Sequence, residues 1–416
     1  MKILLLNQCF YPDVVSTAQH ASDLVAALAE RGHEVTVVAS TRAYDHPDVK
    51  FPSHEDWRGA HILRVPSLNL GKTAKWRRAA NFASFFLTCM LRLLFMPRQD
   101  VVMALTSPPL ISFLGALFAK LKGGQFVFWV MDLNPDEAVA AGWLSEHSAA
   151  TRVLDALLNY SLRAADQIVA LDRFMRQRLI GKGVPAEKIQ IIPPWAHSDV
   201  VYHDPEGRRS FRRRHHLEDK YVVMYSGNHC PCHPLETVLD AAARLAHHPE
   251  IAFCFVGGGS EFAKVKDFAQ TRRLANILCI PYQPLAGLSA SLSAADLHIV
   301  VMGDPFVGIV HACKIYNVMA VGAPVLYIGP SRSHVMDIAA GNGIPFGAAQ
   351  HGDVDAVVAR ILASARYPVP DRHMVARSHT FAQERVVPQF TTLIEGLCTL
   401  APASAPAGEQ SYSLGD

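Results

Sequence analysis

The chain has 416 residues, of which 50% are apolar and 18% are charged, and its formal net charge is +2. A chain of this length is expected to form two domains with separate hydrophobic cores. The nearly balanced charge excludes the broad basic surface of a nucleic-acid-binding protein, and the apolar fraction is too diluted for a polytopic membrane protein.

The first predicted elements alternate between strand and helix. Residues 3–6 form an apolar strand, residues 18–30 have the apolar faces of a helix, and residues 34–38 form a second strand. Strand patterns that are followed by helix-compatible segments recur at residues 100–105, 125–130 and 167–171. Continuous apolar strands of this kind are typical of a buried parallel sheet.

The second half of the chain repeats this pattern after a break. The strand at residues 189–192 ends at two prolines, and a charged stretch up to Lys220 separates it from the next strand. Further strands, with helices between them, are predicted at residues 221–225, 252–256, 277–280, 296–301 and 324–328. The sequence therefore predicts an α/β protein with two facing doubly wound Rossmann-like domains.

The predicted domains comprise residues 1–195 and 196–380. Residues 381–400 are expected to form a C-terminal helix, which can cross back to the first domain. Residues 401–416 are rich in Ala, Pro, Ser and Gly, and we expect them to be a disordered tail.

Three features bear on the location of the protein. Eight scattered cysteines favour reduced thiols in the cytoplasm, and the N-terminus has no signal-peptide pattern. The apolar stretch at residues 82–96 contains Arg92 and is too short to span a membrane, and residues 101–121 are broken by two prolines. The basic run at residues 72–78 directly precedes the first stretch, a pattern typical of an interfacial helix. We therefore expect residues 72–96 to dock peripherally on the anionic inner face of the cell membrane; the alternative is that these apolar residues pack on the sheet.

In open parallel sheets, ligands bind beyond the carboxyl ends of the strands. Gly227 and Asn228 end the first strand of the second domain, and Pro234 is expected in the first turn of the next helix. Because a helix N-terminus offers free N–H groups, this loop is a candidate cradle for a diphosphate. The alternative is an ordinary turn between a strand and a helix.

The same loop presents four residues of metal-ligating type in five positions, from His229 to His233. Structural zinc sites usually take two ligand pairs from well-separated segments, and five consecutive residues cannot easily surround a tetrahedral ion. We therefore expect no metal here.

A series of short motifs follows in a fixed order along the chain. They are residues 11–13 (YPD), 31–35 (RGHEV), 104–109 (ALTSPP), 130–136 (VMDLNPD), 192–195 (IPPW), 225–228 (YSGN), 255–259 (FVGGG), 294–297 (AADL) and 314–317 (KIYN), followed by Met319-Ala320 and Gly322. Up to about residue 398, the chain resembles family 4 glycosyltransferases, especially the branch of O-antigen, capsule and exopolysaccharide assembly.

This resemblance implies a GT-B fold with the acceptor in the N-terminal domain and a nucleoside-diphosphate sugar in the C-terminal domain. The reaction would need neither a metal nor another cofactor, so cationic side chains and backbone N–H groups must meet the charge of the departing diphosphate. The expected catalytic residues are Asp132 and Lys314. The expected donor-binding residues are Lys314 itself with Gly227, Asn228, His229, His233, Gly258, Tyr282 and Asn317, and the expected acceptor-side residues are Ser16, Thr17 and Asp136.

Two of these assignments have alternatives. Asp132 follows a strand and could contact sugar hydroxyls or take the acceptor proton, but it could also cap the next helix. Tyr282 could stack on the base of the donor or be an ordinary loop aromatic.

The chain departs from the family pattern at several positions. Ile309 and Asn317 occupy the places of two glutamates, and Asn317 can bond a ribose without carrying a charge. Val15-Ser16-Thr17 replaces a pair of glycines. The phosphate loop lacks the usual Lys or Arg, and His229 and His233 stand nearby.

The expected function is transfer of a sugar from a nucleoside-diphosphate donor, with UDP as the expected nucleotide, to a lipid-linked or cell-envelope glycan acceptor with retention at the anomeric carbon. Retention in this family is usually assigned to front-side attack, so no protein nucleophile is expected. The alternatives are a nucleotide-sugar epimerase of the same fold and a non-catalytic scaffold that binds sugar nucleotides.

Overall fold

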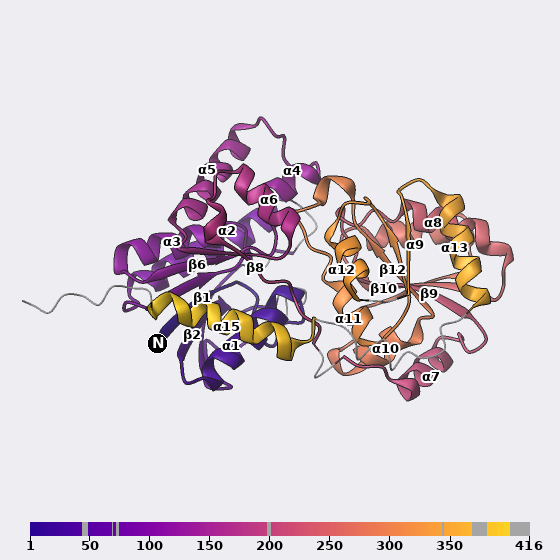
Figure 1. Cartoon of the computed structure of the whole chain (residues 1–416), viewed down its shortest axis with the longest axis horizontal. Coiled ribbons are helices and arrows are strands. Elements are labelled where there is room, and N and C mark those ends of the chain that lie inside the picture. The colour runs from indigo at the N-terminus through magenta and orange to yellow at the C-terminus, as the bar shows by residue number, and fades with distance from the viewer. Residues whose placement is uncertain are drawn as a thin grey trace, which may run out of the picture.

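The computed structural model describes residues 1–43, 49–68, 70–71, 75–197, 201–342, 345–367 and 381–399. It contains two α/β domains that lie side by side (Figure 1). The expectations for Lys72 and for residues 401–416 fall outside the described residues.

The N-terminal domain is built on a sheet whose described strands follow the order β3-β4-β2-β1-β5-β6-β7-β8. Every neighbouring pair is parallel except β3 and β4. Both faces of the central strands are covered, which explains their continuous apolar sequences. The strands are β1 (Lys2–Leu6), β2 (Glu34–Ser40), β3 (His54–Trp57), β4 (Ala60–Val65), β5 (Val101–Ala104), β6 (Gln125–Trp129), β7 (Gln167–Ala170) and β8 (Ile189–Ile191).

Helices cover this sheet, and two of them start at a capping side chain. Ser148 accepts a hydrogen bond from the Thr151 amide at the start of α5, and Asp172 accepts two at the start of α6. The helices are α1 (Ser16–Glu30), α2 (Lys75–Leu94), α3 (Ile111–Lys122), α4 (Asp136–Ala140), α5 (Ala149–Ala164) and α6 (Arg173–Gly181), followed by a 3₁₀ turn at Ala186–Lys188.

The C-terminal domain has an all-parallel sheet in the order β11-β10-β9-β12-β13-β14. Numbered within the domain, this is the 3-2-1-4-5-6 order of Rossmann folds, and the strand order reverses between β9 and β12. The strands are β9 (Tyr221–Asn228), β10 (Ile251–Gly258), β11 (Ile277–Ile280), β12 (Leu297–Val301), β13 (Val325–Ile328) and β14 (Phe346–Ala349).

The helices of this domain begin with α7, whose Arg208 and Arg212 both bond the Asp296 carboxylate just before β12. The helices are α7 (Pro205–Arg214), α8 (Glu236–Arg244), α9 (Phe262–Thr271), α10 (Leu288–Ala294), α11 (Lys314–Ala320), α12 (His334–Asn342) and α13 (Val354–Arg366). Short 3₁₀ turns lie at Leu245–His247, Leu285–Gly287 and Asp304–Phe306.

The last helix, α15 (Gln383–Thr399), lies against the N-terminal domain beside α1, where Figure 1 shows it in yellow. Glu395 pairs with Arg31 and His33 at 2.7 and 3.0 Å, and Phe390 packs edge-on against Trp129 with ring centroids 4.6 Å apart. The chain therefore crosses between the domains twice.

The two domains are also joined by direct hydrogen bonds. The Leu133 amide donates to the Ile309 carbonyl at 2.9 Å, and Arg178 Nε donates to the Val307 carbonyl at 2.7 Å. Gly308, with φ +72°, packs so closely that an added Cβ would lie 2.7 Å from the backbone of Phe174. This contact places the loop after β12 directly against the N-terminal domain.

Candidate functional site

The candidate site is centred on Lys314 at the start of α11, next to the point where the strand order of the C-terminal sheet reverses. Its ammonium group donates a hydrogen bond to the Tyr225 hydroxyl and lies 3.8 Å from the centre of that ring. The end of the Lys314 side chain also lies over Gly227, with Cε and Nζ 3.5 and 3.6 Å from an idealised Cβ position. The Lys314 ammonium group thus lies over Gly227, near the end of β9.

Burial lowers the pKa of Lys314 to about 8, although nearby thiols oppose the shift. The group therefore keeps most of its positive charge at neutral pH. A charge held in a partly desolvated place attracts an anion more strongly than a charge in open water does.

Glycines at the ends of β9 and β10 bring two backbones together. Gly227 and Gly257 have φ values of +132° and +137°, and an added Cβ at Gly257 would lie 2.1 Å from the Gly227 carbonyl oxygen. Only glycine fits this approach. The predicted Gly227, Asn228 and Gly258 therefore lie on adjacent strand ends, and Gly258 pairs with Asn228 in the ladder.

Tyr282 lies against the backbone of Gly258, and a Cβ at that glycine would come within 2.9 Å of the tyrosine ring. The Tyr282 hydroxyl is 3.4 Å from the Gly258 carbonyl oxygen. The side chain is 46% exposed, so part of the aromatic surface stays open to a ligand.

The structure shows the surroundings of the two histidines that are expected to bind the donor. His229 and His233 are both buried, and His233 Nδ1 is 2.6 Å from the Val301 carbonyl oxygen. Burial, with the Lys314 charge, lowers the pKa of His229 to about 4 and that of His233 well below its ordinary value. Both rings are neutral near pH 7, so neither replaces the missing basic residue of the phosphate loop.

The helix that follows this loop also starts later than predicted. Helix α8 begins at Glu236 with Leu235 in the capping position, so Pro234 lies before the helix. The hollow next to it is lined by Pro231, Pro234 and Glu236 and does not include Lys314. The structure thus places Pro234 beside this hollow and not in the first turn of the helix.

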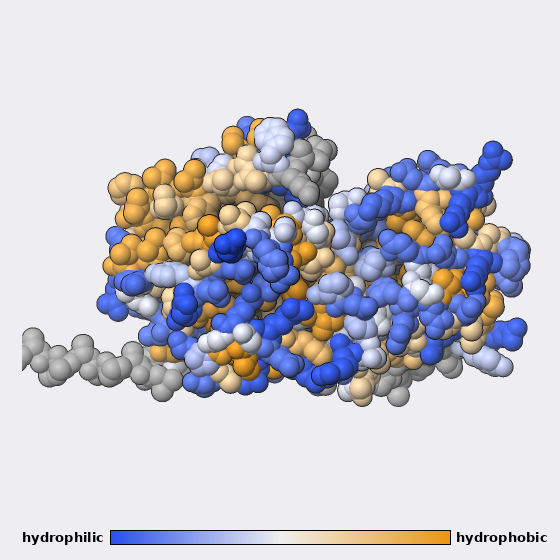
Figure 2. All heavy atoms as spheres, turned by 90° about the horizontal axis from the view of Figure 1, so that it is seen from above, coloured by the Kyte–Doolittle hydropathy of each residue, from blue (hydrophilic) through white to orange (hydrophobic). Residues whose placement is uncertain are grey.

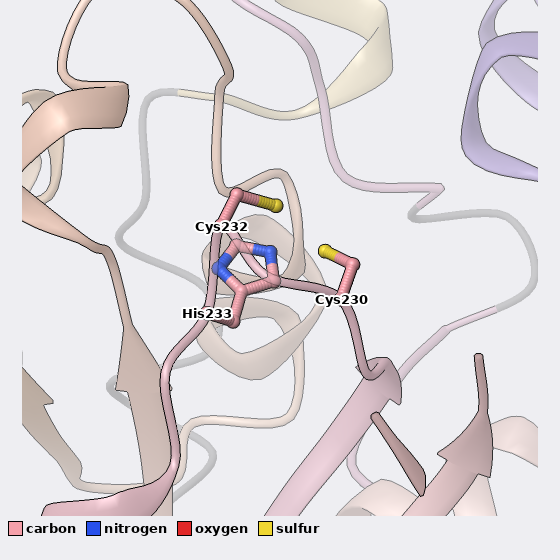
Figure 3. Close-up of side chains that lie close together, drawn as sticks. All are labelled: Cys230, Cys232 and His233. Carbon is pink, nitrogen blue, oxygen red and sulfur yellow. The ribbon is translucent and has the colours of Figure 1, made fainter. Parts of the chain in front are cut away.

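The cysteines of the loop face each other. Cys230, Cys232 and His233 have ligand-type atoms within 4.8 Å of one another, and the two sulfur atoms point toward each other beside the histidine ring (Figure 3). Lys314 interacts with both thiols, so a metal ion bound here would have a positive charge beside it. A second group of this kind comprises Asp172, His311 and His334.

Asp132 lies on the opposite side of the domain interface, close enough to Cys230 for their charges to interact. Its pKa is raised well above the usual value by burial and by the neighbouring Glu137 and Cys230. Asp132 does not cap α4, because that helix begins at Asp136 with Pro135 in the capping position. The raised pKa favours the protonated form of a carboxyl group that lies near Cys230 of the donor-side loop.

The expected acceptor-side residues separate in the structure. Ser16 begins α1 and lies close enough to Cys313, the residue before Lys314, to lower the pKa of its thiol, and Thr17 is next to it. Asp136 instead pairs with Lys182 at 2.9 Å within the N-terminal domain, and Glu137 is the carboxylate beside Asp132. The charge of Asp136 is thus matched by Lys182, and its contact with the acceptor stays a prediction.

The two positions that replace the family's glutamates have different surroundings. Asn317 lies one turn after Lys314, and its Oδ1 atom is buried without a hydrogen-bond partner among the described residues. Such an atom can accept a hydrogen bond from a ribose hydroxyl. Ile309 is buried, and its backbone carbonyl accepts the interdomain bond from Leu133.

Sequence reasoning missed two residues of the site. Tyr225 orients Lys314, and Cys313 connects α11 to Ser16 of the other domain. A signal for Tyr225 existed, because it is a polar-tipped aromatic in an apolar strand two residues before Gly227. No pattern in the sequence indicated the Cys313 contact.

Comparisons with known proteins identify the family. Residues 17–195 match the family model of the glycosyl transferase 4-like domain, and residues 207–363 match that of the glycosyl transferases group 1. The chain belongs to the family 4 glycosyltransferases. The predicted family and GT-B fold are thereby confirmed.

Relatives of this glycosyltransferase span its whole length. It is 27% identical to the putative colanic acid biosynthesis glycosyl transferase WcaI of Escherichia coli (strain K12), over 95% of this chain and 100% of that protein. Its fold resembles that of sucrose-phosphate synthase from Thermosynechococcus elongatus, with a TM-score of 0.72, 15% identity and coverage of 96% and 100%. It also resembles Anabaena HepE in complex with UDP-glucose, with a TM-score of 0.67, 16% identity and the same coverage.

Proposed function

We propose that this glycosyltransferase moves a sugar from a UDP-linked donor to a lipid-linked or cell-envelope glycan acceptor, with retention of the anomeric configuration and without a metal. The observation that carries the proposal is the position of Lys314. Its ammonium group lies over Gly227, at the ligand-binding edge of the Rossmann-type sheet, and it interacts with Cys230, as does Asp132 of the other domain.

In this proposal the donor diphosphate lies on the glycine backbones at the ends of β9 and β10. Lys314 stabilises the charge that develops on the diphosphate as the glycosidic bond breaks. Asn317 accepts a hydrogen bond from the ribose, and the exposed part of Tyr282 contacts the base. A solved relative of the same fold, HepE, was crystallised with UDP-glucose, which supports the choice of nucleotide.

Asp132 is proposed to bind hydroxyl groups of the transferred sugar or of the acceptor. Its raised pKa suits a group that donates a hydrogen bond or exchanges a proton near neutral pH. For retention, the departing diphosphate itself takes the acceptor proton on the same face of the sugar. The protein then contributes position and charge stabilisation.

The test is a donor panel incubated with polyprenyl-diphosphate-linked sugar acceptors and analysed by mass spectrometry, with NMR of the new linkage. A product one sugar heavier, with the anomeric configuration of the donor, is expected. Conversion of the donor sugar without acceptor would instead indicate an epimerase. Nucleotide binding by calorimetry with no transfer to any acceptor would indicate a scaffold.

We further propose that the enzyme works peripherally at the cytoplasmic membrane, docked through helix α2. No helix in the described part of the chain is both long and apolar enough to cross a membrane. Phe85, Cys89 and Leu93 of α2 are buried, so part of the apolar segment does pack in the domain core. The opposite side is open, with exposed fractions of 54 to 85% for Leu87, Leu91, Leu94 and Phe95, and this set is named the α2 apolar face.

The surroundings of this face favour a lipid surface as its partner. Trp76, at the start of α2, is 63% exposed, and Leu121 of α3 is 68% exposed. Figure 2 shows hydrophobic residues gathered over the N-terminal domain in the view from above. Over the other domain, hydrophobic and hydrophilic residues are mixed. Arg77 and Arg78 lie on the first turns of the helix, and basic groups beside an exposed apolar stripe are typical of interfacial helices.

A further inference from the structure

The loop after β9 brings two thiols together beside Lys314. Cys230 and Cys232 are separated by one proline, and their sulfur atoms point toward each other (Figure 3). The sulfur atoms and a ring nitrogen of His233 all lie within 4.8 Å of one another. We name Cys230 and Cys232 the thiol pair. The proposed function gives this pair no part.

Backbone hydrogen bonds hold the thiol pair in place. The His233 amide donates to the Cys230 carbonyl at 2.9 Å, which closes a turn with Pro231 as its second residue. Proline fixes its own φ angle and so limits the freedom of the turn. The Gly303 amide donates to the Cys232 carbonyl at 2.9 Å and ties the turn to the loop after β12. In a tight turn, α-carbons two residues apart lie within the separation that a disulfide spans.

The two thiols differ in exposure and acidity. Cys230 is partly exposed, whereas Cys232 is buried. The neighbouring Cys232 thiol, together with the charge of Lys314, lowers the pKa of Cys230, although burial opposes the shift. Cys230 and burial raise the pKa of Cys232 well above its ordinary value. Cys230 is therefore the nucleophile of the pair, and Cys232 is the thiol that stays protonated.

The charged groups around Cys230 come from both domains. Lys314 of α11 favours the thiolate form, and Glu137 of α4 opposes it. Burial raises the pKa of Asp132 and of Tyr225 well above their ordinary values, and the charge of Cys230 adds to both shifts. These two groups therefore favour their protonated forms. A thiolate at Cys230 is thus stabilised by a cation of the proposed donor site.

Other cysteines of the described chain are poorer nucleophiles. Burial raises the pKa of Cys89, Cys254 and Cys313 to about 12, so these thiols stay protonated near neutral pH. Cys279 of β11 is partly exposed, and burial raises its pKa as well. Because the thiolate is the reactive form, an oxidant is expected to react with Cys230 before these four.

The state of the thiol pair affects the charge of Lys314. Burial lowers the pKa of Lys314 to about 8, and the charges of Cys230 and Cys232 oppose this shift. A disulfide carries no negative charge, so its formation would remove that opposition. The pKa of Lys314 would then fall further, and a smaller fraction of the side chain would be charged near pH 8.

We infer that Cys230 and Cys232 form a reversible disulfide that weakens donor binding at Lys314. The formation of the disulfide goes beyond the proposed function. Its effect on the donor rests on that function, because the function places the donor diphosphate at Lys314.

The oxidant is a small-molecule disulfide. The Cys230 thiolate attacks one sulfur atom of the oxidant, a bond forms between these two atoms, and one thiolate departs. Cys232 then loses its proton and attacks the Cys230 sulfur, which forms the internal disulfide and releases the second thiolate. The two cysteines lose two electrons, and the oxidant gains them. The two protons of the pair pass through solvent to the two released thiols.

The test incubates the reduced full-length protein with glutathione disulfide in EDTA, so that no metal ion competes for the thiols. The remaining thiols are alkylated, and peptide mass spectrometry locates each disulfide. The variants are Cys230→Ser and Cys232→Ser. Cys279→Ser is the matched control, because Cys279 is a partly exposed cysteine of the same domain outside the loop.

The wild type and Cys279→Ser are expected to form a disulfide between Cys230 and Cys232 that dithiothreitol reverses. Cys232→Ser should stop at a mixed disulfide of Cys230 with glutathione, and Cys230→Ser should form neither product. Absence of the internal disulfide in the wild type, or a stable glutathione adduct there, would overturn the inference. This decision uses the wild type alone and does not require a variant to fold.

Calorimetry with UDP at pH 8 then compares the oxidised and reduced wild type. Oxidation is expected to weaken UDP binding about two- to fivefold, because Lys314 passes from about half charged to mostly neutral. In Lys314→Ala the difference between the two states should disappear. Equal UDP affinity of the oxidised and reduced wild type, or an equal loss on oxidation in Lys314→Ala, would overturn the effect through Lys314.

These readouts do not depend on turnover. If the donor panel yields no transfer, the proposed function fails, and the disulfide can still be detected. If transfer occurs but the wild type forms no disulfide between Cys230 and Cys232, the inference fails and the proposed function stands.

Discussion

Asp172 and His311 meet across the domain interface, with His311 Nδ1 2.7 Å from the Asp172 carboxylate. The other carboxylate oxygen accepts hydrogen bonds from the Phe174 and Met175 amides, both at 2.8 Å, at the start of α6. His311 Nε2 lies 2.7 Å from the Tyr316 hydroxyl. Because both side chains are buried, each bond compensates for lost hydration, and the pair fixes how the two domains meet.

Asp172→Asn is expected to lower the free energy of unfolding by about 3 kcal/mol, since it leaves a buried pair broken. The matched control is Arg173→Gln, which removes the neighbouring interdomain pair with Asp337, where both side chains are largely exposed. That change should cost less than about 1 kcal/mol. Urea unfolding followed by tryptophan fluorescence measures the free energy of unfolding of both variants. Equal losses in the two variants would contradict the larger contribution of the buried Asp172 pair.

The same pair gives a pH dependence of stability. Burial alone would raise the pKa of Asp172, but the bond and charge of His311 outweigh it and hold the pKa below the ordinary value of 3.8. The stabilisation is therefore present above pH 3.8 and is lost as the pH falls below it. Between pH 5 and pH 3 the wild type should lose more stability than Asp172→Asn, and parallel curves would show that the pair does not contribute.

Lys314→Ala is expected to reduce kcat/KM for the donor about ten- to a hundredfold, because one charge-assisted contact contributes about 1.5 to 3 kcal/mol. The fold should persist, as circular dichroism can verify. A variant with wild-type turnover and wild-type donor affinity would rule out the assignment of Lys314.

The lowered pKa of Lys314 gives a second test of the same residue. With a pKa of about 8, the free enzyme loses this charge as the pH rises through that value, so kcat/KM for the donor should fall above about pH 8. Lys314→Arg should move the decline to higher pH, since a guanidinium stays protonated there. An unchanged pH profile in this variant would exclude Lys314 as the titrating group.

Transfer activity is expected to survive excess EDTA. Among the described residues, the loop group of Cys230, Cys232 and His233 is the metal candidate nearest Lys314. Loss of transfer in EDTA that one divalent ion restores would contradict this prediction. In that case Cys230→Ser should abolish the restoration and so identify the site.

Membrane docking can be tested on the basic residues and the exposed apolar residues of α2 and the segment before it. Replacing Lys72, Lys75 and Arg77 by Gln should weaken flotation with anionic liposomes, since each basic group contributes about 1 kcal/mol near an anionic surface. Replacing Leu91 and Phe95 by Ser should weaken it as well, and Leu93, which is buried, is unsuitable as a target. No flotation of the wild type at low salt would refute the proposal.

The sequence predicted the sheets well because buried parallel strands are continuous apolar runs, which stand out from amphipathic helices. It did not predict β3, β4 or β14. Of these, β3 (His54–Trp57) is an edge strand whose polar residues form no apolar pattern.

Side-chain partners were less predictable, because they depend on which face each residue presents after folding. Asp132 and Asp136 are four residues apart, yet one lies near Cys230 of the other domain and the other pairs with Lys182. Histidine is a residue type that often binds ligands, but the ring of His233 hydrogen-bonds the Val301 carbonyl of a strand. Tertiary packing between segments that are distant in the chain determines which partner each of these side chains has.

The return of α15 to the N-terminal domain has a consequence during synthesis. Phe390 packs against the ring of Trp129, and Glu395 pairs with Arg31 and His33. Trp129, Arg31 and His33 of the first domain can therefore make these contacts only after α15 has been synthesised. Domains generally fold as units in the order in which they are made. Here the entire C-terminal domain must be synthesised before α15 can pack on the N-terminal domain and complete it.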